Sequence, residues 1–219
     1  MRSILRKHRQ LWNRREYLKL VGVGVILLSI GLICMSQARL FLIRSAVHKV
    51  SSPDLFLDLI PVMGLENVLA WGIPLFLGLV ACLFFLYPER IPFSLKTVGL
   101  LFLIRSFFVV LTPLGMRADQ VVQAPQGFLQ DLAYSSYDFF FSGHVAVPFL
   151  FALIFWRNPW VRSLMLCIAL FVAAAVLLAH THYSIDVFSV PFIVPTIYRI
   201  AQHFFRDDIT SAAPTSIAR

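Results

Sequence analysis

A histidine and an aspartate four residues apart could form a reactive pair. His182 and Asp186 lie in the stretch AHTHYSID (179–186), and on a helix this spacing would place them on one face, in contact. An aspartate bonded to one imidazole nitrogen fixes the tautomer and makes the other nitrogen more basic, which suits a nucleophile. A pair that only satisfies itself at a helix start is an equally good interpretation. A metal site on His180 and His182 lacks a convincing third ligand.

A second stretch, FFFSGH (139–144), could seat a phosphate group. We expect Ser142 and Gly143 to open a helix, whose first N–H groups have no internal partner and lie at the positive end of the helix dipole. Serine can donate a hydrogen bond, and glycine lets an anion approach the backbone. His144 follows and could give or take a proton, although an N-cap beside an interfacial histidine explains this stretch alone more simply. Pro148 predicts an irregular first turn.

Three charged residues lie outside these stretches in places that suggest function. Arg105 lies within an otherwise apolar segment, where its planar fork could bind phosphate oxygens, unless it snorkels to the surface. Asp54 and Asp58 are four residues apart in SPDLFLDLIP. They could fix Arg105, orient a cationic head group or cap a short interfacial helix.

The composition assigns the chain to the membrane proteins. Of its 219 residues 59% are hydrophobic and 14% are charged, and the mean hydropathy is +0.80. A soluble domain would carry about 25% charged residues. The net charge of +8 is concentrated before residue 20 and no nucleic-acid-binding motif is present, so we expect no nucleic-acid partner. The three cysteines lie within apolar runs, so we expect no disulfide, metal or cofactor.

The elements that must position these residues are membrane-spanning helices, each of which needs about 20 mostly apolar residues. The sequence predicts one all-α domain over residues 1–219, with a basic segment at 1–17 and a loose tail at 206–219. The first apolar run is too long for a signal peptide and is expected to stay as a helix. Six spans are predicted, at 18–37, 68–87, 96–114, 139–156, 161–180 and 185–204.

The distribution of positive charge predicts that both termini are cytoplasmic. With that orientation the inner side holds the seven basic residues before residue 20 together with Arg90, Lys96, Arg157, Arg162, Arg199, Arg206 and Arg219. The outer side holds only Arg39, Arg44, Lys49 and Arg117. The histidines and most of the acidic groups described above then gather at the outer ends of the helices.

Together these motifs resemble the sphingomyelin synthases and their relatives, a branch of the type-2 phosphatidic acid phosphatase superfamily. Four stretches match in the family's order: PDLFLD in the first outer loop, Arg105 with Thr112 and Leu114, DFFFSGH from Asp138, and AHTHYSIDV ending at Val187. The last two are specific and the first two are weak. The chain departs from the family at Ser136 and Tyr137, where the family has Cys-Gly, and at Pro113, which precedes Leu114. It also lacks the Lys-x6-Arg-Pro signature of the wider phosphatases, and these departures leave the acceptor open.

The resemblance implies a catalytic triad of His144, His182 and Asp186 on the lumenal, periplasmic or extracellular face. It implies transfer of a phospho-head-group from a glycerophospholipid to a lipid alcohol, ceramide or diacylglycerol, and we expect a phospho-histidine intermediate. With water as acceptor the same site would be a lipid phosphatase or a phospholipase C-type hydrolase; a carrier or scaffold is a remote alternative, and a homo-oligomer stays open. The candidate substrate-binding residues are Arg105, Ser142, Gly143, Asp138, Tyr183, His180, Asp54 and Asp58.

Overall fold

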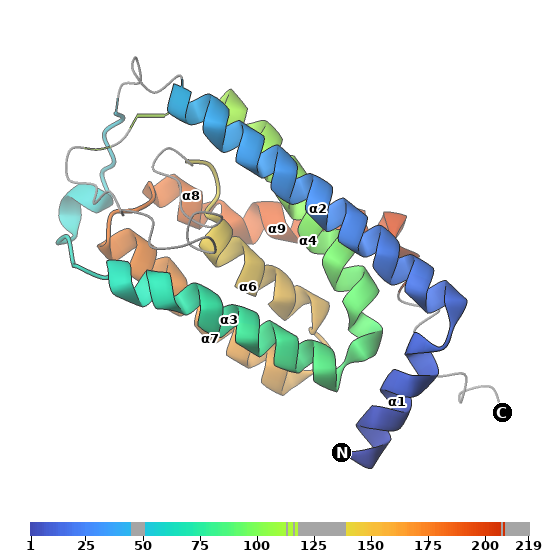
Figure 1. Cartoon of the computed structure of the whole chain (residues 1–219). Coiled ribbons are helices and arrows are strands. Elements are labelled where there is room, and N and C mark those ends of the chain that lie inside the picture. The colour runs from blue at the N-terminus through green and yellow to red at the C-terminus, as the bar shows by residue number, and fades with distance from the viewer. Residues whose placement is uncertain (45–50, 113, 116, 118–138, 207, 209–219) are drawn as a thin grey trace.

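The apolar segments fold as helices, because a helix pairs its backbone groups internally where lipid offers no partner. The computed structural model describes residues 1–44, 51–112, 114, 115, 117, 139–206 and 208 (Figure 1). Within these residues every regular element is a helix, which confirms the all-α prediction. In chain order they are α1 (Arg2–Trp12), α2 (Arg15–Arg44), η2 (Leu57–Leu59), α3 (Glu66–Leu86), η3 (Pro88–Arg90), α4 (Ile91–Leu111), α6 (Gly143–Ile154), α7 (Pro159–Leu178), α8 (Ser184–Phe188) and α9 (Val190–Phe204).

Five helical segments within the described part of the chain are long and apolar enough to cross a membrane. They are α2, most of α3, η3 continued by α4, α7, and α8 continued by α9. Five of the six predicted spans therefore have a matching helix. The first is longer than expected, since α2 has 30 residues.

The sixth predicted span, 139–156, is helical only over the 12 residues of α6. At a rise of about 1.5 Å per residue this helix is far shorter than the roughly 30 Å hydrocarbon layer. α6 is enclosed by protein, and Ala146, Leu150 and Ala152 on it are fully buried. Irregular backbone at membrane depth is tolerated where protein surrounds it, so α6 does not need the length of a lipid-facing helix.

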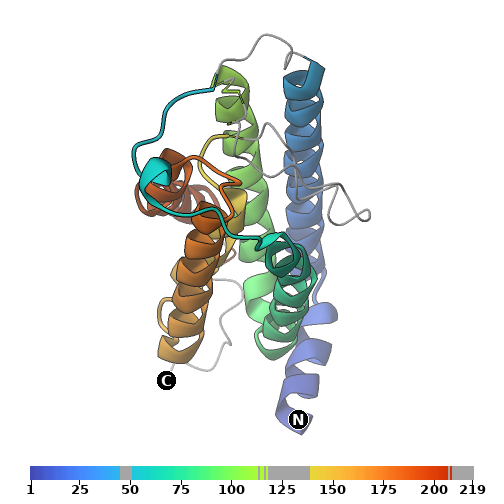
Figure 2. The same cartoon turned by 90° about the vertical axis from the view of Figure 1, so that its left-hand side faces the viewer.

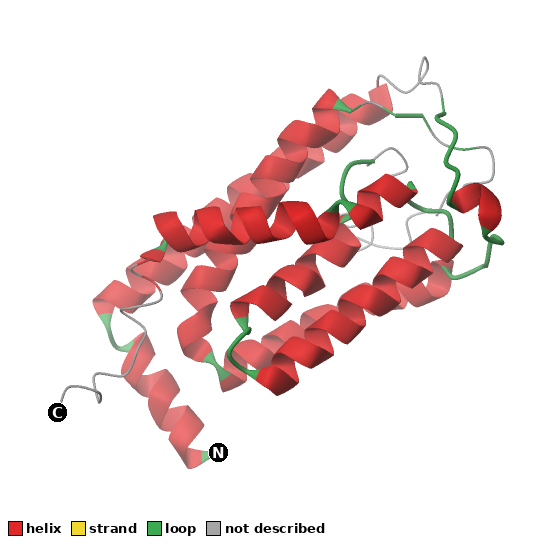
Figure 3. Ribbon diagram, turned by 180° about the vertical axis from the view of Figure 1, so that it is seen from behind, coloured by secondary structure: helices red, strands yellow, loops and turns green. Residues whose placement is uncertain are grey.

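The helices form two groups around α6. α2 and α4 run side by side along one flank, whereas α3 and α7 lie along the other (Figures 1 and 2). α6 contacts α4, α7 and α9, so it joins the two groups. Figure 3 views the molecule from the opposite side to Figure 1, and there α9 lies nearer the viewer than α6. The largest cluster of buried apolar side chains surrounds α6.

Ion pairs link neighbouring segments at one end of the bundle, which we call the basic end. Lys7 of α1 contacts Glu89 of η3 at 2.7 Å. Lys96 near the start of α4 pairs with Asp208 at 2.7 Å, and both side chains are buried. Asp208, which the sequence analysis assigned to a loose tail, is thus attached to the bundle.

Close contact between α2 and α4 depends on glycine. A Cβ at Gly31 would lie 2.5 Å from the carbonyl oxygen of Gly99, and a Cβ at Gly99 would lie 2.7 Å from the backbone nitrogen of Leu28. No side chain fits at either position without moving a backbone. Small residues of this kind let two helices approach closely in a membrane, where burial alone does not drive association.

We expect Gly31→Ala to destabilise the protein by about 1–3 kcal/mol, because the added methyl group must separate α2 from α4. Thermal unfolding of the detergent-solubilised protein would measure the effect. Gly78→Ala in α3 is the matched control, since a Cβ there meets nothing within 4 Å. Equal melting temperatures for the two variants would contradict this account of the helix contact.

Candidate active site

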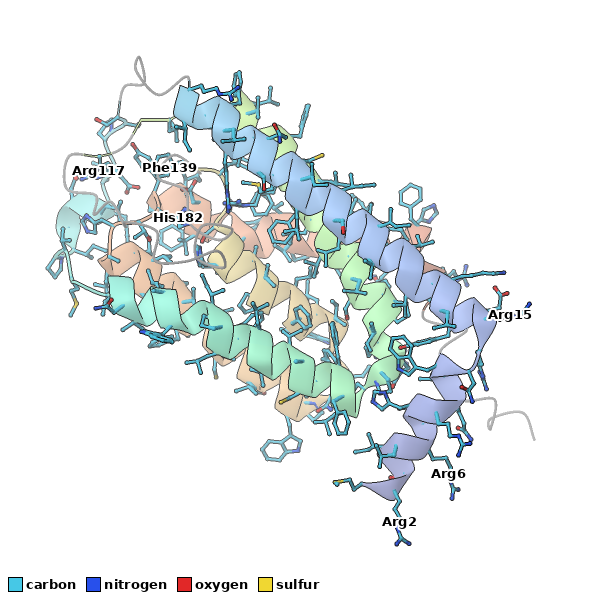
Figure 4. The ribbon with its side chains drawn as sticks, viewed as in Figure 1. Arg2, Arg6, Arg15, Arg117, Phe139 and His182 are labelled. Atoms are coloured by element: carbon cyan, nitrogen blue, oxygen red, sulfur yellow. The ribbon has the colours of Figure 1, made fainter. Side chains whose placement is uncertain are left out.

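The candidate catalytic residues lie at the end of the bundle opposite the basic end, which we call the site end. Figure 4 places His182 and Phe139 there, whereas Arg2 and Arg6 lie at the other extreme of the molecule. Three segments far apart in the sequence meet at the site end: the last turns of α4, the start of α6 and the connection from α7 to α8.

His182 and Asp186 contact each other within this cluster. Nδ1 of His182 lies 3.3 Å from Oδ2 of Asp186, and both side chains are buried. The contact that the spacing suggested is present, although the two residues do not share one helix. α8 begins at Ser184, so His182 lies in the preceding turn. The backbone N–H of Tyr183 donates to the same carboxylate oxygen at 3.1 Å, which holds Asp186 in place for the imidazole.

His144 faces His182 from another helix. It is the second residue of α6, which begins at Gly143 with Ser142 as its N-cap, as the sequence predicted. The centroids of the two imidazole rings are 6.0 Å apart and their planes are inclined by 64°. His144 is only partly buried, in contrast to His182. A phosphoryl group between the two rings could therefore contact both of them, with His144 on the more exposed side.

Arg105 lies against the start of α6. Its side chain is 2% exposed, its Nε donates to the carbonyl oxygen of Phe141 at 2.9 Å, and its Nη1 contacts the sulfur of Met35 at 3.4 Å. A Cβ at Gly143 would touch the guanidinium carbon at 3.5 Å. The arginine is thus fixed inside the protein and does not reach the surface. Its positive charge therefore lies beside the start of α6, which is the positive end of the helix dipole, and this arrangement suits an anion.

The two histidine-bearing segments are joined through their backbones. The N–H of Ser142 donates to the carbonyl oxygen of Asp186 at 2.8 Å, and the hydroxyl of Ser189 donates to the same oxygen at 3.3 Å. The hydroxyl of Ser142 is fully buried and has no hydrogen-bond partner among the described residues. A buried hydroxyl without a partner costs free energy, so a ligand oxygen at this position would be stabilised.

Asp54 attaches the first loop at the site end to α8. Its Oδ2 accepts from the N–H of Ser184, at 2.6 Å, and its Oδ1 accepts from those of Phe56 and Leu57, at 3.1 Å each. Burial alone would raise the pKa of Asp54, but these three N–H donors, Ser184 first, outweigh it and hold the pKa below its usual value. Both oxygens are used by backbone groups, which is the capping role left open by the sequence.

The other candidate substrate-binding residues have different surroundings. The hydroxyl of Tyr183 donates to the carbonyl of Gly115 at 2.8 Å and accepts from the N–H of Ser52 at 3.1 Å, so it joins three chain segments. Asp58 is half exposed and pairs with Arg117 at 2.7 Å, away from Arg105. Asp138 lies outside the described residues.

His180 ends α7 in a strained backbone conformation. Its φ of 49° lies in the left-handed region, which usually requires glycine at this position after a helix. The N–H groups of His180 and Thr181 donate to the carbonyls of Leu177 and Val176, at 3.0 and 3.1 Å, which closes the helix end. This turn directs the chain back toward α8 and so brings His182 to the carboxylate of Asp186. No group of three or more His, Cys, Asp or Glu side chains within the described ranges could hold a metal ion.

Sequence reasoning did not identify the groups that hold Arg105 and the loops around the site. The carbonyl of Phe141 and the sulfur of Met35 hold Arg105, and the hydroxyl of Tyr183 links the surrounding chain segments. A backbone carbonyl leaves no signal in a sequence, since every residue has one. Tyr183 belongs to a motif that was singled out, but only the fold shows that its hydroxyl links two loops.

Comparison with known families gives one match, and it covers the segment that contains the two facing histidines. Residues 137–204 match the family model described as PAP2 superfamily C-terminal, which is about a third of the chain and includes His144, His182 and Asp186. The match supports the type-2 phosphatidic acid phosphatase superfamily at this coarse level, with no choice among its branches. No curated protein and no solved structure shows significant similarity to the chain.

Proposed function

We propose that the chain is a membrane-embedded lipid phosphotransferase that moves a phospho-head-group from a glycerophospholipid to a lipid alcohol. One observation carries the proposal. A buried His182–Asp186 pair, a second histidine whose ring centroid is 6.0 Å away, and a buried arginine at a helix start occupy one site. This arrangement supplies a nucleophile, an acid and an anion seat, and all but Arg105 lie in the segment that matches a family of lipid phosphatases and phosphotransferases.

In the first step Nε2 of His182 attacks phosphorus, because Asp186 at its Nδ1 keeps Nε2 unprotonated and basic. The phosphorus–oxygen bond to diacylglycerol breaks, and its electron pair leaves with the glycerol oxygen. His144, which is partly exposed beside His182, donates a proton to that oxygen. The products are diacylglycerol and a phospho-histidine at His182.

In the second step an acceptor hydroxyl attacks the phospho-histidine. His144, now neutral, removes the hydroxyl proton, and the bond from phosphorus to His182 breaks to regenerate the imidazole. Arg105 and the N–H groups at the start of α6 stabilise negative charge on the phosphoryl oxygens in both steps. The residues needed are the same whether the acceptor is ceramide, diacylglycerol or water.

Water as the acceptor is the second candidate, favoured by the match to a phosphatase superfamily. The chain would then be a lipid phosphatase or a phospholipase C-type hydrolase. A non-catalytic carrier is disfavoured because carriers place their polar groups near the midplane, whereas these histidines gather at one end of the bundle.

Product analysis tests the proposal. Purified protein is incubated with head-group-labelled phosphatidylcholine, phosphatidylethanolamine or phosphatidic acid, with and without ceramide or an added diacylglycerol whose acyl chains differ in length from those of the donor. A labelled lipid product that requires the acceptor supports transfer, and a water-soluble labelled product formed without an acceptor supports hydrolysis. If none of the substrates is consumed, the proposal is rejected.

We also propose that both termini are cytoplasmic and that the chain crosses the membrane six times. Five long helices alone would leave the termini on opposite sides, so this topology needs α6 with its flanking residues as the sixth crossing. The site end then faces the periplasm, lumen or exterior, and the basic end faces the cytoplasm, in agreement with the position of the N-terminal arginines.

In intact cells we expect an impermeant thiol reagent to label Ser51→Cys but neither Ser3→Cys nor Thr215→Cys. The three native cysteines would first be replaced by serine. Permeabilised cells, in which all three positions should react, provide the control. Labelling of Thr215→Cys from outside would reject the sixth crossing.

A further inference from the structure

Two leucines in the loop after α2, at the site end, have highly exposed side chains. Leu55 and Leu59 are each 83% exposed, whereas Leu57 between them is 1% exposed and Asp54 is 7% exposed. The loop is therefore attached through its buried residues and projects its leucines outward. Exposed apolar side chains that stand beside a rigid anchor indicate a contact surface.

This loop is attached to the helix that carries Asp186. Asp54 accepts from the N–H of Ser184 at 2.6 Å, and the ring of Phe56 meets the edge of Phe188 with centroids 5.1 Å apart. α8 and α9 form a candidate membrane span, so their exposed apolar residues face lipid. We call the surface formed by Leu55, Leu59 and the exposed apolar residues of that span the rim patch. The span contributes Ile185, Phe188 and Phe192, which are 63%, 48% and 77% exposed. The loop thus continues a lipid-facing surface beyond the start of the span.

The acidic groups near the rim patch have hydrogen-bond or ion-pair partners. Asp54 is bound by three backbone N–H groups, and Asp58 pairs with Arg117 at 2.7 Å. Residues 51–65 contain no other charged group. An apolar loop whose acids are paired can lie at the boundary between head groups and acyl chains at low cost.

We propose that the rim patch holds the acyl chains of the lipid whose phosphoester is cleaved. Ile185 and Phe188 lie on α8, the short helix that also carries Asp186, so a lipid whose tails contact the patch lies beside the helix that holds the imidazole of His182. The site thereby selects phosphoesters that reside in a bilayer over water-soluble ones. This inference rests on the proposed function and adds the surface that holds the acyl chains of the substrate.

The double variant Leu55→Asp with Leu59→Asp tests substrate selection in reconstituted vesicles. We expect turnover of a dioleoyl phospholipid to fall about tenfold or more, while turnover of its dibutanoyl analogue stays within about twofold, because only the long chains use the patch. Trp160→Asp with Phe204→Asp is the matched control. These residues are 86% and 72% exposed and lie at the start of α7 and the end of α9, away from the rim patch. We expect this variant to turn over both substrates as wild type does. Equal losses for the two substrates, or no loss for either, would overturn the proposal.

A spin label measures the contact independently of activity. In a background without native cysteines, Leu59→Cys should be more accessible to oxygen, which partitions into lipid, than to a water-soluble nickel complex. Ser51→Cys in the same loop should show the reverse order. If wild type turns over neither substrate, the proposed function fails and the label still reports on the membrane contact. A label at position 59 that favours the nickel complex would refute the inference itself.

Discussion

His182→Ala is expected to abolish turnover and to remove any phospho-enzyme, with a loss of about 10³-fold or more, as for other covalent nucleophiles. The reason is that Asp186 holds Nδ1 of His182, at 3.3 Å, which orients this imidazole and leaves Nε2 available to attack phosphorus. Rapid quench with labelled substrate should show an adduct in wild type that is labile in acid and stable in alkali. His203→Ala, which removes an exposed histidine near the end of α9, is the control and should behave as wild type.

The role of His144 follows from the same experiment with a different leaving group. His144→Ala should slow adduct formation strongly for a phospholipid but much less for a nitrophenyl phosphoester, whose leaving group needs no proton. Asp186→Asn should reduce turnover less than His182→Ala does, since the imidazole remains while its tautomer is no longer enforced. If the adduct persisted in His182→Ala and vanished in His144→Ala, the roles of the two histidines would be exchanged.

Arg105→Lys should lower turnover by about 10²-fold or more, the usual loss when a donor to a transition-state oxyanion is removed. Lysine keeps the charge but lacks the planar fork that bonds the carbonyl of Phe141 and lies flat against Gly143. We expect the loss mainly in kcat, because charge on the phosphoryl oxygens grows as the transition state forms.

Two comparisons separate this effect from a loss of structure. The melting temperature of Arg105→Lys should stay near that of wild type, since the aliphatic part of the side chain still fills its buried position. Arg162→Lys, at an arginine that contacts Trp156 at the basic end, should leave turnover unchanged. Turnover of Arg105→Lys close to that of wild type would show that Arg105 serves only to support the fold.

The sequence predicted the helices better than it predicted the site. Apolar length identified five spans because lipid imposes the same requirement on every lipid-facing helix. Apolar length overestimated the length of α6, because the buried residues before and after it, such as Phe141 and Phe155, are as apolar as the helix itself. Hydropathy reports burial in lipid or in protein alike, and only the fold distinguishes the two.

Spacing predicted the contact between His182 and Asp186 but not the backbone that makes it. The contact is formed by a turn before α8, in which Tyr183 bonds the same carboxylate. The role of Asp54 could not be chosen from sequence, because its partner Ser184 is 130 residues away. Interactions within four residues leave a pattern in the sequence, whereas those between distant segments depend on how the helices are arranged.

The hydrogen bond from Ser184 to Asp54 joins two segments that leave the ribosome at different times. The two residues are 130 positions apart, and the bond from Ser52 to Tyr183 spans 131. At about 5–20 residues per second, the loop after α2 must wait on the order of ten seconds for the segment that secures it. Both of these cross-links, together with the His182–Asp186 pair, form only after α7 has left the ribosome. A chain released before α8 would insert most of its helices and would contain His182, but it would lack Asp186 and the bond that orients the imidazole. Incomplete copies of this kind are therefore expected to have little activity toward the lipids around them.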